Sequence, residues 1–125
     1  VGLLFIFPRK VIFQNTEIHV AGIGGVVTHL SFRRQGVATK ILIHTNEFLK
    51  QQNFDLALLC TDIPRLGGLY NQVGFVPMVN SYIFTDKNGK QKEETGGMIC
   101  TIKNQSKTDL IQNSKEIIKV GQSNF

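Results

Sequence analysis

The chain has 125 residues, of which 42% are hydrophobic and 18% are charged, and its formal net charge is +5. This size and composition are typical of one globular domain with its own core, and no apolar run approaches the roughly 18 residues of a membrane-spanning helix. Basic residues are spread along the chain without interleaved aromatic residues, and no metal-ligand spacing occurs, so we expect no nucleic-acid partner, no membrane partner and no metal.

The first 28 residues contain four short apolar or β-branched runs, which predict strands separated by turns. The runs are residues 1–8, 11–13, 17–20 and 23–28. A turn or bulge is predicted at Pro8–Lys10, and a turn is predicted at Asn15–Thr16. Val1 is not typical of a natural start, so we expect that an N-terminal segment of the domain is missing from this chain.

The clearest helix is predicted over residues 37–49, where apolar side chains recur with a period of 3.6. One stripe contains Val37, Ile41 and Phe48, and the next contains Ala38, Leu42, Thr45 and Leu49. The run Leu56–Cys60 is continuously apolar, which predicts a strand covered on both faces. Strand 23–28, this helix and strand 56–60 together predict a βαβ unit.

The second half predicts a short helix at Arg65–Gln72, which Gly74 ends, and then a hairpin. Residues 75–79 and 81–85 form two strands or one bent strand, and Met98–Ile102 returns after the Asn-Gly turn. The charged run 86–94 is expected to be a solvated hairpin tip. Residues 108–120 predict a peripheral helix capped by Thr108 or Asp109, or a partly disordered tail. We therefore expect a domain at 1–107 and a C-terminal segment at 108–125.

The loop between the strand 23–28 and the helix carries the most information. It reads Arg33-Arg34-Gln35-Gly36-Val37-Ala38 and opens directly onto a helix N-terminus. Free N–H groups, the positive end of the helix dipole and two guanidinium groups meet there. Gly36 allows the backbone to approach a phosphate closely, and Ala38 keeps the first helical turn slim. The sequence therefore predicts an anion site.

This loop and a second motif resemble the GNAT superfamily of acyl-CoA-dependent N-acyltransferases. The family signature Arg/Gln-x-x-Gly-x-Gly/Ala reads Arg33-x-x-Gly36-x-Ala38, and a tyrosine four residues before a Gly-Phe pair reads Tyr70 and Gly74-Phe75. The match covers about residues 23–78. It departs from the family in the run before the tyrosine, where Asn and Ala are usual and the chain has Ile63 and Leu66.

Two further runs are similar to the branch that contains aminoglycoside acetyltransferases. They are residues 21–29 (AGIGGVVTH) and 96–100 (GGMIC). The resemblance to the superfamily implies an α/β (α+β) fold, with a mixed central sheet whose parallel strand pair is splayed and flanked by helices. It also implies transfer of an acetyl group from acetyl-CoA to a primary amine, by direct attack in a ternary complex.

The resemblance also assigns residues to coenzyme A. The main chain before the loop would hold the pantetheine arm and the acetyl group, and a backbone N–H there would stabilise the developing oxyanion. The amides of residues 34–39 would hold the pyrophosphate. The predicted cofactor contacts are Val26, Val27, Thr28, Arg33, Arg34, Gln35, Gly36, Val37, Ala38, Thr39 and Asn71.

Tyr70 is the predicted general acid, because a phenol with a pKa of about 10 can protonate a leaving thiolate. The proton acceptor stays open, because residues 21–27 contain no acid. The candidate groups are Glu17, His19, His29 and Asp62, with a water chain or a group in the missing segment as the alternatives.

Cys60 and Cys100 lie in apolar runs, which favours reduced thiols in the cytoplasm over a disulfide framework. Cys60 is interpreted as a small core residue and not as a nucleophile, because no histidine partner accompanies it. Core positions are also the simplest interpretation of the phenylalanines at 5, 7, 48 and 54, and of Phe75 and Met78.

Two competing functions remain on the sequence alone. The missing N-terminal wall and the strand without an acid favour a non-catalytic CoA-binding module. A site for another anion, such as a nucleotide phosphate, ranks last because the loop lacks the Gly-Lys-Ser/Thr of a P-loop. The acceptor could be a small molecule, a peptide N-terminus or a lysine side chain, and the oligomeric state, a homodimer included, stays open.

Overall fold

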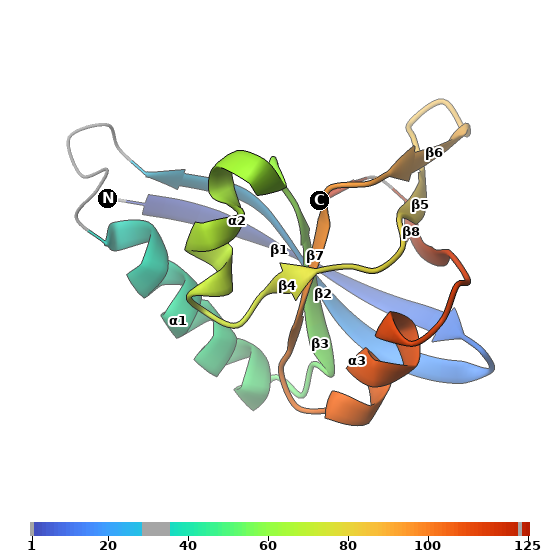
Figure 1. Ribbon diagram of the computed structural model, residues 1–125, viewed down its shortest axis with the longest axis horizontal. Coiled ribbons are helices and arrows are strands. Elements are labelled where there is room, and N and C mark those ends of the chain that lie inside the picture. Colours follow the sequence, from blue (N-terminus) through green and yellow to red (C-terminus); the bar gives the residue numbers. More distant parts are fainter. Residues whose placement is uncertain (1, 29–35, 123) are drawn as a thin grey trace.

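The computed structural model describes residues 2–28, 36–122 and 124–125. The elements are β1 (Gly2–Phe13), β2 (Thr16–Thr28), α1 (Val37–Gln51), β3 (Leu56–Cys60), α2 (Ile63–Asn71), β4 (Val76–Pro77), β5 (Tyr82–Thr85), β6 (Gln91–Glu94), β7 (Gly97–Thr101), α3 (Gln105–Gln112) and β8 (Ile118–Gln122). A five-stranded sheet has the order β1-β2-β3-β7-β4, and a small three-stranded sheet has the order β6-β5-β8. Figure 1 shows α1 and α2 in the left half of the molecule and the small sheet in the right half.

β1 and β2 form one long antiparallel hairpin, and the turn or bulge predicted at Pro8–Lys10 is wrong. Pro8 pairs with Ala21 in a stretch of the ladder that is regular from Phe5 to Phe13. β1 is the edge strand, where a residue without an N–H donor is tolerated. The chain reverses at Gln14 and Asn15, both with positive φ, and β2 then continues without the break predicted between residues 20 and 23.

The predicted βαβ unit is confirmed. β2 and β3 are parallel, with rungs from Val20–Leu56 to Ile23–Leu59, and α1 is the crossover between them. Their pairing stops at Ile23, although β2 continues to Thr28. In the same stretch the register against β1 shifts, because Leu3 pairs with Val27 but Phe5 pairs with Gly24. β2 therefore carries one extra residue, a bulge that bends the strand and raises its twist.

β2 and β3 thus separate at their carboxyl ends, as the prediction of a splayed parallel pair requires. We call this place the fork, and we define it by residues 24–28 of β2 and by Cys60 and Thr61 at the end of β3. Within the described residues, the ladder of β2 past Ile23 runs to β1 alone. One edge of the β2 backbone at the fork is therefore left without a strand partner.

Side chains of the central strands alternate between two buried clusters, one on each face of the sheet. The helix face, covered by α1 and α2, contains Ala21, Ile23, Leu42, Leu49, Phe54, Ala57, Leu59, Tyr70, Phe75, Met98, Cys100 and Ile102. The small-sheet face contains Val11, Phe13, Ile18, Val20, Leu56, Leu58, Tyr82, Phe84, Ile99, Ile111, Ile118 and Val120. Of the phenylalanines expected in the core, Phe54 is buried, but Phe5 and Phe48 are 52% and 47% exposed.

The second half of the chain is wound differently from the prediction. The strand that returns from the Asn-Gly turn is β6, which pairs with β5. Residues 98–102 instead belong mainly to β7, which lies between β3 and β4 in the large sheet. The physical reason is that Met98, Ile99 and Cys100 are apolar on both faces, so only a central strand buries them all.

The C-terminal segment is a helix followed by a strand, so the helix predicted over residues 108–120 is wrong. α3 is capped by the Asn104 side chain, which accepts a hydrogen bond from the Lys107 N–H, and Thr108 instead bonds the Thr101 hydroxyl at 2.7 Å. Ile118 and Val120 are buried on alternate positions of β8, a period of two that fits a strand. The division expected after residue 107 falls inside α3. No helix of the described residues is long and apolar enough to cross a membrane.

Candidate acyl-transfer site

Three predicted features meet at one edge of the large sheet. Because β2 and β3 are parallel, their carboxyl ends lie at the same edge, and α1 and α2 follow them directly in the chain. Figure 1 shows the start of α1 and the end of β2 on the same side of the molecule. In sheets of this kind, ligands bind outside the carboxyl ends of the strands where neighbouring strands part.

The first feature is the N-terminus of α1. Gly36 is its N-cap, and within the described residues no side chain caps the helix and no acidic residue lies in its first turn. The first hydrogen bond of the helix joins Lys40 N to Gly36 O at 3.0 Å. The N–H groups of Val37, Ala38 and Thr39 are therefore available to an anion.

Gly36 itself is fixed by backbone geometry. Its φ of +73° lies in the left-handed region, where a side chain is strained. Among the described residues, a Cβ at this position would meet no atom within 4 Å. The predicted contacts Arg33, Arg34 and Gln35 lie outside the described residues.

The second feature is the main chain of β2 at the fork. The predicted contacts Val26, Val27 and Thr28 belong to the stretch of β2 that has separated from β3. An unpaired strand edge presents N–H and C=O groups to an extended ligand in the way that another strand would.

The third feature is Tyr70, on the side of α2 that faces the sheet. The ring is 7% exposed and packs edge-on against Phe75, with ring centroids 6.2 Å apart. Its hydroxyl hydrogen-bonds the side chain of Thr61, which follows β3 directly and so stands at the fork. Burial raises the pKa of Tyr70, and the Thr61 hydrogen bond opposes this shift. The phenol is thus held in its protonated form.

Thr61 is a candidate site residue that the sequence analysis did not name. Its only signal is that it is the first polar residue after a fully apolar strand. α2 also begins earlier than predicted, at Ile63, because Asp62 is its N-cap and Pro64 lies in its first turn. Asn71, the remaining predicted contact, is exposed, and its amide donates to Phe75 O at 3.1 Å.

The four candidate proton acceptors do not gather at the fork. Glu17 pairs with Lys10 at 3.7 Å near the β1–β2 turn. His19 stacks on Phe54, with ring centroids 4.2 Å apart. It stands opposite Lys10 in the β1–β2 ladder, in the half of β2 away from the fork. Asp62 lies just after the fork but faces Arg65 at 3.6 Å. His29 lies outside the described residues.

A carboxylate that the sequence prediction treated as solvated reaches the fork from the small sheet. Glu94 is partly buried at the end of β6, and its Oε2 accepts a hydrogen bond from Cys60 Sγ at 3.4 Å. Burial and the nearby Glu94 charge raise the pKa of the Cys60 thiol. The thiol therefore stays neutral, which agrees with the prediction that Cys60 is not a nucleophile.

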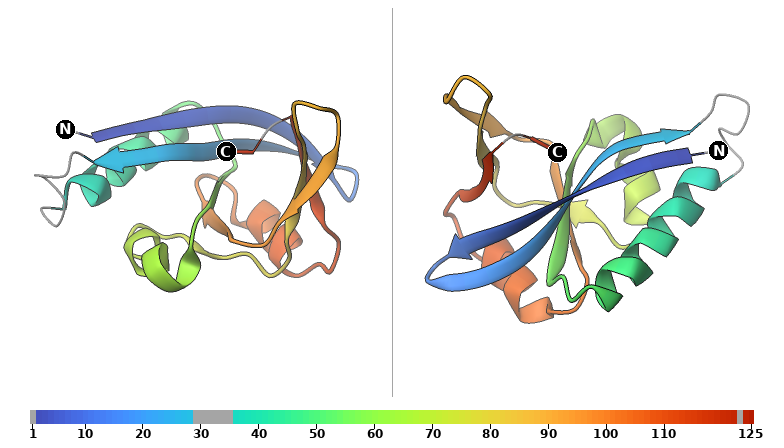
Figure 2. Two further views of the ribbon diagram at one scale, coloured as in Figure 1. Left: turned by 90° about the horizontal axis from the view of Figure 1, so that it is seen from above. Right: turned by 180° about the vertical axis from the view of Figure 1, so that it is seen from behind.

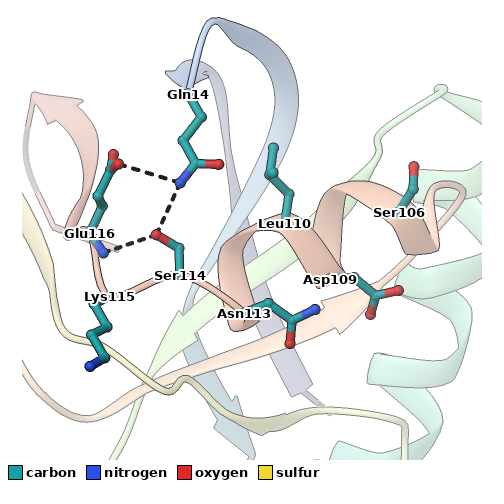
Figure 3. Close-up of a pocket in the computed structure, with 8 residues that line it drawn as sticks. All are labelled: Gln14, Ser106, Asp109, Leu110, Asn113, Ser114, Lys115 and Glu116. Carbon is teal, nitrogen blue, oxygen red and sulfur yellow. Dashed lines mark hydrogen bonds between the residues drawn. The ribbon is translucent and has the colours of Figure 1, made fainter.

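A hollow of about 710 Å³ lies elsewhere, between the β1–β2 turn and α3 (Figure 3). Its rim is polar: Gln14 Nε2 donates to Ser114 Oγ at 3.1 Å and to Glu116 Oε1 at 3.4 Å. Gln14 is at the end of the hairpin opposite to the fork. This hollow therefore contributes nothing to the site described above.

Comparison with known proteins identifies the family. The model of the acetyltransferase (GNAT) domain matches residues 1–78, more than half of the chain. The chain belongs to the GNAT family. This confirms the resemblance drawn from the two motifs, and the mixed sheet with a splayed parallel pair confirms the expected fold. No curated protein matches the sequence.

Solved GNAT structures share the fold of this GNAT chain. A GNAT family N-acetyltransferase from Escherichia coli, solved in complex with CoA, is 14% identical with a TM-score of 0.63, over 96% of this chain and 59% of that one. The ribosomal-protein-S18-alanine N-acetyltransferase of E. coli is 16% identical with a TM-score of 0.51, over 80% and 61%. A GCN5-related N-acetyltransferase from Anabaena variabilis is 24% identical with a TM-score of 0.56, over 64% and 20%. The chain thus spans between about a fifth and three fifths of these proteins.

Proposed function

We propose that the chain is an N-acetyltransferase that moves the acetyl group of acetyl-CoA to a primary amine by direct attack in a ternary complex. The observation that carries this proposal is that the fork, the uncapped N-terminus of α1 and the Tyr70 hydroxyl lie at one edge of the sheet. They supply main-chain groups for an extended thioester, N–H groups for a diphosphate and a proton donor for a leaving thiolate.

In this proposal, coenzyme A follows the predicted contacts from loop to strand. The diphosphate binds the N–H groups at the start of α1, with the loop arginines beside it. The pantetheine arm and the acetyl group lie along the main chain of residues 26–28. The complex of the E. coli relative with CoA supports this choice of substrate.

The transfer then needs one new bond and one proton. The neutral amine attacks the acetyl carbonyl, and a β2 backbone N–H at the fork stabilises the negative oxygen, which is typically worth about 2.7–4 kcal/mol. The C–S bond breaks, and the thiolate takes the proton of the Tyr70 hydroxyl. The amide nitrogen releases a proton in turn, so that the tyrosine is restored.

The variant Tyr70→Phe tests this function. Wild type and variant are assayed for release of the CoA thiol with an aminoglycoside, spermidine and short peptides as acceptors, and acetyl-CoA affinity is measured by calorimetry. We expect kcat to fall about 100-fold or more, as for loss of a general acid, while the dissociation constant of acetyl-CoA stays the same. Unchanged turnover would remove Tyr70 from the mechanism.

A non-catalytic CoA-binding module is the second candidate. It is favoured by the position of Phe125, because the ring of this residue already occupies the space beside the fork. The ring lies against Gly22 of β2, on the face of the sheet opposite to Tyr70. In that case the chain would bind acetyl-CoA, but no amine would increase the release of thiol above the rate of hydrolysis.

A further inference from the structure

Beside the fork, two glycines of β2, Gly22 and Gly24, face the small sheet. Gly22 and Gly24 alternate with Ala21 and Ile23, which point to the helix face, so the glycines present bare backbone to the small sheet. A Cβ on Gly22 would overlap the ring of Phe125, and a Cβ on Gly24 would lie 2.9 Å from Cε2 of Phe7. The glycines thus allow a flat ring to lie directly on the strand beside the fork.

The ring that lies there belongs to the end of the described chain. Phe125 stacks on Tyr82 with centroids 5.8 Å apart and approaches Phe7 at 6.5 Å, while the Arg9 guanidinium covers it at 5.7 Å. All views place this end of the chain near the centre of the molecule, between the small sheet and the half that contains α1 and α2 (Figures 1 and 2). We call the space that the Phe125 ring fills the slot. The backbone of Gly22 forms its floor and the rings of Phe7 and Tyr82 lie beside it, so the slot suits a flat apolar group.

A carboxylate lies beside this slot. Tyr82, which forms one side of it, donates its hydroxyl hydrogen to Asn124 Oδ1, and the neighbouring Cys60 Sγ donates to Glu94 Oε2 at 3.4 Å. The β2–β3 ladder ends at the pair Ile23–Leu59, so Cys60 is the first residue of β3 beyond it. Because Glu94 contacts Cys60, Glu94 approaches the point where the two strands separate. Glu94 registers with Tyr82 across the β5–β6 ladder, which fixes this approach.

Other carboxylates are less well placed. Glu17 pairs with Lys10 at the far end of the hairpin, and Asp55 is held by Lys107 at 3.0 Å and by the His19 N–H at 2.7 Å. Asp62 is on the α2 side and faces Arg65. Glu93, next to Glu94, points the other way along β6 and contacts Ser81.

We propose that this slot is the acceptor subsite, that it takes primary amines with a flat aromatic body, and that Glu94 receives their ammonium group. The inference rests on the acetyltransferase function proposed above. The aromatic body takes the place of the Phe125 ring on Gly22. The ammonium group then binds Glu94 on the face of the fork opposite to Tyr70.

The proton balance follows from this arrangement. The ammonium group gives one proton to the Glu94 carboxylate, and the neutral nitrogen attacks the thioester carbonyl. The C–N bond forms, the C–S bond breaks, and the thiolate takes the Tyr70 proton. The nitrogen loses its second proton, which restores Tyr70, and Glu94 releases its proton to solvent. The products are the acetamide, the CoA thiol and one proton.

Two amines of nearly equal shape test the role of Glu94. 2-Phenylethylamine is mostly protonated at neutral pH, whereas its 2,2-difluoro analogue, whose amine the fluorines make less basic, is largely neutral. We expect Glu94→Gln to lower kcat/KM for 2-phenylethylamine about 100-fold and to lower it far less for the analogue. Glu93→Gln is the matched control, on the same strand with the same charge, and should stay within twofold of wild type for both amines.

Further readings separate a chemical from a structural role. Acetyl-CoA affinity should be equal in wild type, Glu94→Gln and Glu93→Gln, and Glu94→Asp should recover part of the lost rate. Phe125→Ala should lower KM for 2-phenylethylamine several-fold, because its ring no longer competes for the slot. An unchanged or higher KM in that variant, or equal rates in Glu94→Gln and Glu93→Gln, would overturn the subsite.

Failure of this inference can be told from failure of the proposed function. A wild-type chain that acetylates spermidine or peptides but not 2-phenylethylamine would overturn the aromatic subsite and leave the acetyltransferase function standing. A wild-type chain that neither binds acetyl-CoA nor acetylates any of these amines would overturn both.

Discussion

If Tyr70 is the general acid, its raised pKa must appear in the pH dependence of the reaction rate. Burial disfavours the charged phenolate, so the pKa of Tyr70 lies above its ordinary value of about 10. A general acid acts only while it is protonated. Its contribution is therefore complete below the raised pKa and is lost as the pH rises through it.

We accordingly predict that kcat of the wild type stays level on the alkaline side until above about pH 10 and falls only there. The measurement is the pH dependence of kcat with saturating acetyl-CoA, and Tyr70→Phe serves as the control in which this fall is absent. A fall that starts near neutral pH and disappears in Tyr70→Phe would contradict the raised pKa.

At the scale of residues, the sequence singled out those candidate site residues that belong to a local motif. Gly36 could be singled out because a glycine lets the backbone approach a phosphate, and Tyr70 because its spacing from Gly74 and Phe75 is a family pattern, and the roles of both stay predictions. Thr61 and Glu94 could not be predicted. The Thr61 contact depends on how α2 turns back over the end of β3, and the Glu94 contact joins two segments far apart in the chain, β6 and β3.

At the scale of elements, the start of α1 makes the sharpest prediction. Gly36→Glu adds a negative charge where the proposal seats a diphosphate, so we expect CoA affinity to fall at least about 100-fold. Gly89→Glu is the matched control. Gly89 also has a positive φ, +79° against +73°, and open space around it, but it lies at the β5–β6 turn.

Calorimetry with CoA measures both variants. Strain and added charge are the same in the two chains, so only the position differs. Equal affinities for CoA in Gly36→Glu and Gly89→Glu would place the diphosphate away from α1.

A second prediction at this scale concerns Asp55, whose hydrogen bonds connect β2, β3 and β7 at the end of the sheet away from the fork. The Asp55 carboxylate accepts from the His19 N–H at 2.7 Å and from Lys107 Nζ at 3.0 Å. Asp55 O also accepts from the N–H groups after β7. We predict that Asp55→Ala lowers the free energy of unfolding by about 2–3 kcal/mol, because two charge-assisted bonds are lost.

Urea unfolding with Glu17→Ala as the control checks the prediction. The Glu17 carboxylate pairs with Lys10 at 3.7 Å, but both side chains are more than half exposed, so its loss should cost no more than about 1 kcal/mol. Equal losses in the two variants would mean that Asp55 does not join the strands.

Elements with one strong periodicity could be predicted from the sequence, and elements chosen by long-range pairing could not. The stripe Leu42, Thr45 and Leu49 is buried as expected, and the apolar run Leu56–Cys60 is β3. The helix predicted over residues 108–120 begins later than α3 and ends beyond it, because Ile118 and Val120 become strand residues only beside β5. The pairing of β7 with β3 is likewise a non-local choice.

At the scale of the whole molecule, two sheets meet at the fork. The large sheet provides the parallel pair and the two helices that follow it, and the small sheet brings Tyr82 and Glu94 to the opposite face. The βαβ half could be predicted, because its contacts are local in sequence and its motifs are specific. The small sheet could not be, because β8 joins β5 across more than thirty intervening residues, and short polar strands such as β6 carry a weak signal.

The central claim is that one edge of the sheet seats acetyl-CoA, from the start of α1 to the fork. A crystal structure of the chain with CoA tests it most directly. We predict the diphosphate on the N–H groups of Val37, Ala38 and Thr39, the pantetheine arm along residues 26–28 of β2, and the sulfur beside the Tyr70 hydroxyl. A CoA molecule bound elsewhere, or β2 and β3 closed against each other with the start of α1 turned away from the diphosphate, would contradict the account.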